Sequence, residues 1–94
     1  MEQIHEVVSN YYRISSELLL SGRRDRTVSR ARQVAIYLCR IYTNHSYSEI
    51  GSYFGNRNFS TVRFSERKIQ QLLESESTIK NDLKEIRDIM QNLP

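Results

Sequence analysis

The sequence contains a single cysteine, Cys39, and this scarcity excludes a fold held by internal disulfides. The neighbours of Cys39 are apolar, so we expect a buried, structural thiol in a reducing compartment. No apolar run approaches the roughly 18 residues that cross a membrane. Met1 leads directly into Glu2, which is not the start of a secretory signal. These absences together predict a cytoplasmic location.

The motifs of a small enzyme are also missing. The chain has no glycine-rich loop followed by Lys and Ser or Thr, the arrangement that holds nucleotide phosphates. It has no paired carboxylates, no Cys–His pair and no cluster of metal ligands, and its two histidines, His5 and His45, are far apart in sequence. We therefore expect no catalytic residue, no metal, no cofactor and no small-molecule substrate in this chain.

Alternating strand patterns and pairs of turn-forming glycines are absent, whereas apolar residues recur at helical spacing throughout. The 94 residues, 38% hydrophobic and 27% charged, are typical of one globular domain over residues 1–94. The pattern predicts an all-α fold. Its six helices are expected at about 2–12, 16–20, 28–42, 46–54, 58–74 and 79–93. The third helix is expected to bury a stripe that ends at Ile41, and the last to bury Leu93.

The stretch from residue 44 to residue 68 has the signals of two helices joined by a tight turn. Ser46 and Glu49 have the spacing of a capping box. Gly55 is suited to end the first helix, and Asn58 to cap the second. The pattern predicts a helix-turn-helix at about 46–73. Hydroxyls at the head of its second helix, with cations along the flank, favour a DNA groove. The alternative is an ordinary solvated helical hairpin.

Positive charge is concentrated in the middle of the chain. The net charge is only +3, but residues 23–68 carry ten Lys or Arg against three Asp or Glu, and both ends are mildly acidic. Such asymmetry points to a polyanionic partner. A basic loop spans 23–26. A helical stripe of Arg30, Gln33, Tyr37 and Arg40 then reads as a phosphate-facing surface or as a plain solvated face. Thr43 fits a phosphate contact or a cap.

Several motifs in unbroken order resemble one family. They are RRDRTVSRARQVA at 23–35, TNHS at 43–46, EIG at 49–51, FG at 54–55, STV at 60–62 and RKI at 67–69. The chain resembles the C-terminal DNA-binding domain (domain IV) of the bacterial chromosomal replication initiator DnaA. That resemblance implies a six-helix bundle with a Trp-repressor-like helix-turn-helix. It also implies binding to double-stranded DnaA boxes at the origin, on the nucleoid. In the family, ATP binds a separate upstream domain. The sequence leaves open whether this chain is an excised domain or a complete small protein.

The resemblance implies the following roles. Arg24 matches a minor-groove arginine, Arg40 and Thr43 match phosphate contacts, and Tyr47 and Ser48 match a Leu-Pro pair that touches bases. The head of the recognition helix departs from the family, because Asn58 and Phe59 stand where Asp and His are usual. We expect Asn58 to pair bidentately with adenine and Phe59 to touch a thymine methyl or to bury its ring. The expected DNA-binding residues are Arg24, Arg26, Arg30, Arg32, Arg40, Thr43, Tyr47, Ser48, Arg57, Asn58, Phe59, Ser60, Thr61, Arg63 and Lys68.

Two rival functions remain open from the sequence. The first is a DnaA-like domain in a regulator or mobile-element protein with a different target site, and the altered residues Asn58 and Phe59 keep it open. The second is a helical protein-interaction module whose basic face holds an acidic partner. A salt-dependent preference for one DNA sequence would dispose of the second rival.

Overall fold

The protein folds into six helices in a computed structural model that describes residues 1–93. No strand occurs in this range, so the all-α prediction is confirmed. None of the helices within residues 1–93 has the length and apolar character needed to cross a membrane. The helices are α1 (Glu2–Tyr12), α2 (Ser16–Leu20), α3 (Arg26–Tyr42), α4 (Tyr47–Tyr53), α5 (Phe59–Ser75) and α6 (Ser77–Gln91).

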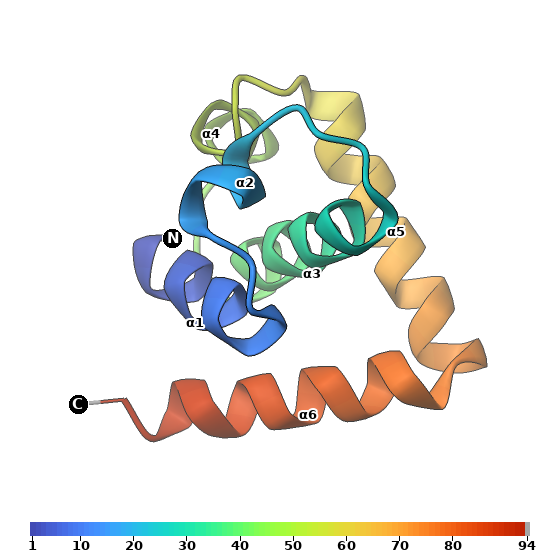
Figure 1. The fold of residues 1–94 in the computed structure, drawn as a ribbon. Coiled ribbons are helices and arrows are strands. Elements are labelled where there is room, and N and C mark those ends of the chain that lie inside the picture. Colours follow the sequence, from blue (N-terminus) through green and yellow to red (C-terminus); the bar gives the residue numbers. More distant parts are fainter. Residues whose placement is uncertain (94) are drawn as a thin grey trace.

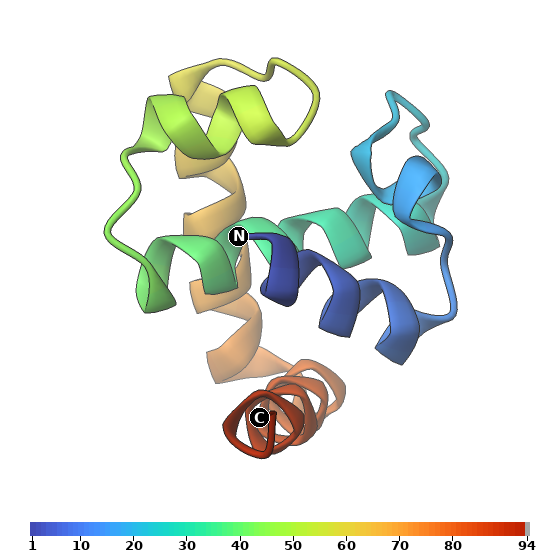
Figure 2. The ribbon, with the colours of Figure 1, turned by 90° about the vertical axis from the view of Figure 1, so that its left-hand side faces the viewer.

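Helix α3 is the central element, and it contacts α1, α2, α4 and α5 (Figure 1). Helix α6 lies across one end of the molecule, where it packs on α1 and on the last turns of α5. Helix α4, the head of α5 and the loop after α2 lie at the opposite end, as both views show (Figure 2). The two segments expected to meet DNA therefore share one end of the bundle.

The core is built from the apolar stripes of all six helices, with Phe54, Ile69 and Ile86 among its fully buried side chains. Cys39 is buried as expected, and burial raises the pKa of its thiol to about 12. Two expectations are wrong: Ile41 is 47% exposed and Leu93 is 38% exposed. Each lies in or beyond the final turn of its helix, where the neighbouring helices no longer cover both sides.

The acidic ends of the chain come together where α1 meets α6. The Tyr11 hydroxyl donates to Asp82 Oδ1 at 3.1 Å and to Glu85 Oε2 at 2.5 Å, and the Tyr12 hydroxyl donates to Asp82 Oδ2 at 2.9 Å. Burial and these carboxylates raise the pKa of both tyrosines well above the usual range. Asp82 and Glu85 thus lie on α6, which Figure 1 shows at the end of the molecule away from the head of α5.

Candidate nucleic-acid interface

Helix α4 starts at the capping box that its sequence predicts. Ser46 Oγ accepts from the Glu49 backbone N–H at 3.1 Å, and the Ser46 N–H donates to Glu49 Oε1 at 2.8 Å. The hydrogen bonds from Ser46 lower the pKa of the Glu49 carboxyl. The backbone N–H groups of Ser46 and Glu49 thus both have partners, and this capping box fixes where the short helix α4 begins.

The turn between α4 and α5 is folded tightly back onto α4. Gly55 and Asn56 have φ values of 87° and 58°, a left-handed conformation that glycine and asparagine tolerate best. The Arg57 N–H donates to the Gly51 carbonyl at 2.8 Å. A Cβ added to Gly51 would lie 2.1 Å from the Arg57 carbonyl oxygen. This close backbone approach sets how α5 leaves α4.

The head of α5 is capped by Asn58, as predicted. Asn58 Oδ1 accepts from the Thr61 N–H at 2.9 Å and from the Thr61 hydroxyl at 3.1 Å. The bidentate pairing with adenine expected from the sequence needs this same oxygen as an acceptor, and the cap already gives it two hydrogen bonds. Phe59 and Ser60 are exposed beside it, and the Phe59 ring is half open to solvent rather than buried.

A cluster of side chains braces α4 against α5. The Arg40 guanidinium lies 4.1 Å from the centre of the Tyr47 ring, and its Nη1 donates to the His45 carbonyl at 3.2 Å. The Tyr47 hydroxyl donates to Glu66 Oε1 at 2.7 Å, and Arg40 Nε lies 3.9 Å from Glu66 Oε2. The Phe59 ring meets Tyr47 edge-on, with centroids 5.0 Å apart. Arg40, whose side chain is 34% exposed, thus positions the helices as well as offering charge.

The Thr43 hydroxyl makes hydrogen bonds within the turn between α3 and α4. Its hydroxyl donates to the Cys39 carbonyl at 2.5 Å and accepts from the His45 N–H at 3.2 Å. Of the two roles that the sequence allowed, the structure shows the cap.

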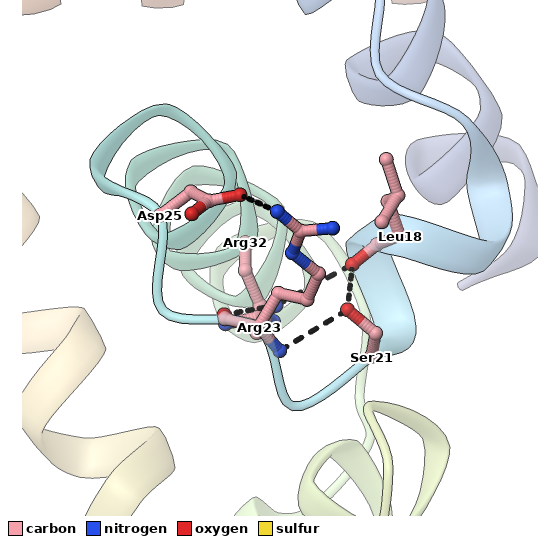
Figure 3. A network of polar contacts seen from close by, with 5 residues as sticks. All are labelled: Leu18, Ser21, Arg23, Asp25 and Arg32. Carbon is pink, nitrogen blue, oxygen red and sulfur yellow. Dashed lines mark hydrogen bonds and ion pairs between the residues drawn. The ribbon is translucent and has the colours of Figure 1, made fainter.

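The basic loop after α2 is anchored by a buried arginine (Figure 3). Arg32 is only 6% exposed, and its guanidinium donates to the carbonyls of Leu19 at 2.8 Å, Arg23 at 3.1 Å and Leu18 at 3.4 Å. Burial lowers its pKa, and the charge of Arg57 lowers it further. The expected DNA contact of Arg32 is corrected to a structural role for Nε and Nη2, because backbone carbonyls hold both of these donors.

A second arginine joins this loop to the turn before α5. Arg57 Nη2 donates to the Ser21 carbonyl at 2.6 Å, across 36 residues of sequence. Arg57 Nε and Gln33 Oε1 are buried and have no hydrogen-bond partner among residues 1–93. Arg57 therefore joins two segments of the protein, and its expected contact with DNA stays a prediction.

A hollow of about 260 Å³ separates the loop from the head of α5. Arg24 borders it on the loop side, and Thr61 and Phe64 border it on the helix side. Phe64 is 60% exposed, and sequence reasoning missed it. Its position two residues after the inward-facing Val62 is the signal that places it on the outer face of α5.

The remaining predicted residues are divided between two sides of the molecule. Arg26 and Arg30 border a separate hollow with Glu76 and Asp82, toward α6, and Tyr37 is buried. The expected phosphate-facing stripe on α3 therefore does not form a single surface. Ser48 and Arg63 are exposed and Lys68 is half-buried, all on the helix-turn-helix itself.

A comparison with known families supplies the decisive observation. The family model described as the bacterial dnaA protein helix-turn-helix matches residues 1–69, which include the basic loop, α4 and the head of α5. The chain belongs to this DnaA family. Membership implies DNA binding in replication initiation. Every residue expected to meet DNA lies inside the matched range, whereas α6 lies outside it.

Proposed function

We propose that this DnaA-family chain anchors a replication initiator to DnaA-box-like sites in double-stranded DNA. The head of α5 occupies the major groove, and Arg24 enters the neighbouring minor groove. The observation that carries this proposal is the hollow between them, because Arg24 and Thr61 border the same space from opposite sides.

The chemistry of that hollow suits the sugar-phosphate strand that separates two grooves. Arg24 and Arg57 bring positive charge to it. Phosphate contacts of this kind supply affinity and register, whereas base contacts supply specificity. The exposed head of α5 beside the hollow presents the amide of Asn58, the ring of Phe59 and the hydroxyl of Ser60 for the second task.

The direct test is to select bound sites from a random pool of duplex DNA and then titrate the selected site at several salt concentrations. We expect one box-like sequence, with each substituted base pair costing about 1–3 kcal/mol. The logarithm of affinity should fall with log salt by about 0.9 per phosphate contact. Binding without sequence preference would contradict the proposal. A selected site unrelated to origin boxes would favour the regulator or mobile-element alternative, and the absence of salt-dependent DNA binding would favour the protein-interaction module.

The minor-groove role of Arg24 makes a separate prediction. Arginine is attracted to the narrow minor groove of A·T-rich DNA, where the negative potential is strongest. Arg24→Ala should therefore lose most of its affinity on A·T-flanked sites and little on G·C-flanked ones, measured by fluorescence anisotropy. Arg23→Ala is the matched control, because Arg23 is in the same loop but pairs with Asp25 at 2.6 Å. Equal losses on both flanks would make Arg24 a general phosphate contact.

A further inference from the structure

The N-cap of α5 determines which hydrogen-bonding groups Asn58 has left for a ligand. A carbonyl oxygen has two lone pairs, and Asn58 Oδ1 already accepts two hydrogen bonds, both from Thr61. The amide nitrogen carries two N–H donors, and no hydrogen bond from it is formed within residues 1–93. Asn58 is exposed at the tip of the helix, so these donors face solvent.

Turning the amide over would not free an acceptor without loss. The NH₂ group would then face the Thr61 N–H, and the first turn of α5 would lose its cap, which is typically worth about tenfold in a folding equilibrium. The Asn58 amide therefore keeps its oxygen toward Thr61 and presents its NH₂ group to a base edge.

We infer that Asn58 reads DNA as a hydrogen-bond donor only, and that it selects a base with an acceptor on its major-groove edge and rejects cytosine. Guanine offers O6 and N7, and thymine offers O4. Cytosine presents only an exocyclic amino group there, which Asn58 in this orientation cannot accept, whereas adenine still offers N7 as an acceptor beside its amino group. This inference rests on the proposed function, since it assumes that the head of α5 enters the major groove.

The neighbouring side chains do not replace the missing acceptor. Phe59 offers only an apolar ring, packed edge-on against Tyr47. Thr61 has its hydroxyl proton directed at Asn58. The DnaA resemblance places an aspartate at position 58, and an aspartate cap keeps its second carboxylate oxygen free as an acceptor. The change from Asp to Asn therefore reverses the hydrogen-bonding polarity at this position while the helix keeps its cap.

The test compares the intact chain with Asn58→Asp and Asn58→Ser. All three residues cap helices well, so thermal unfolding followed by circular dichroism should give similar midpoints. Each protein is used to select sites from the same random duplex pool, and all four base pairs are then measured at every position of the selected box. Asn58→Asp adds repulsion from DNA phosphates that is common to all sequences, so the readout is relative affinity within each protein.

We expect the intact chain to prefer guanine or thymine at one position by about tenfold over cytosine. Asn58→Asp should reverse that preference toward cytosine at the same position. Asn58→Ser should lose the preference without reversing it, because serine has no polar atom beyond its capping oxygen. If all three proteins keep the same selected box, the inference is overturned and the proposed function stands. If none selects any box, the proposed function fails and the inference fails with it.

Discussion

Replacing Gly51 by alanine is expected to remove about 3 kcal/mol from the free energy of unfolding, the upper end of what overpacking usually costs. The new methyl group would lie 2.1 Å from the Arg57 carbonyl oxygen and 3.4 Å from a methyl of Val62. Backbone cannot rotate away as a side chain can, and the Arg57 N–H is also bonded to Gly51. The turn must therefore open. Urea unfolding followed by circular dichroism measures the loss.

Gly22→Ala is the matched control for this experiment. A Cβ at Gly22 meets nothing within 4 Å. We expect it to be neutral or to stabilise the protein by up to about 1 kcal/mol, because alanine restricts the unfolded chain. If both variants unfold at the same urea concentration, the turn does not pack on α4 as the structure has it.

Arg32→Ala is expected to cost about 3 kcal/mol of stability, and to weaken DNA binding only through the loop that it holds. The buried Leu19 carbonyl and the part-buried Arg23 carbonyl would lose the guanidinium, and the Leu18 carbonyl would keep only its hydrogen bonds from Ser21. Hydrogen bonds to a charged group contribute about 1.5–3 kcal/mol each, although such losses do not add. At temperatures where the variant stays folded, its loop should no longer hold Arg24 in place, so the preference for A·T flanks should shrink.

Two companion variants separate these effects. Arg23→Ala breaks only an ion pair with Asp25 whose side chains are more than half exposed, worth less than about 1 kcal/mol. Arg32→Lys keeps the charge but not the planar fork of donors, so it should remain clearly destabilised. Reduced DNA affinity in Arg32→Ala at unchanged stability would restore the direct DNA contact that the sequence alone predicted.

Local signals in the sequence were sufficient for the six helices and for the helix ends around the turn between α4 and α5. The capping box at Ser46, the left-handed Gly55 and the cap at Asn58 each depend on residues three or fewer positions apart, and all three are confirmed. Helical periodicity likewise predicted six helices. The resemblance to DnaA rested on motifs within the same local stretches, and the family match agrees with it.

The fate of each arginine was not predictable in the same way. Three arginines with the same side chain in similar basic surroundings have different roles. Arg24 is exposed, Arg32 is buried, and Arg57 donates a hydrogen bond to the distant Ser21 carbonyl. The difference comes from backbone carbonyls that only the folded chain brings near, at separations of 9 to 36 residues. The engagement of the Asn58 oxygen has another origin. The sequence predicted the cap. It did not predict that Thr61 would donate two hydrogen bonds to the Asn58 oxygen and so occupy both of its lone pairs.

The tie between Arg57 and the Ser21 carbonyl has a consequence for how DNA is engaged. This hydrogen bond joins the segment before the basic loop to the segment before α5. Arg32, on α3, holds the last turn of α2 by its bond to the Leu19 carbonyl. The two reading elements are therefore ordered relative to each other before any DNA arrives. Little conformational entropy is left to lose on binding, so most of the contact free energy appears as affinity. In the proposed complex, the domain would hold Arg24 and the head of α5 at a fixed separation that matches two adjacent grooves.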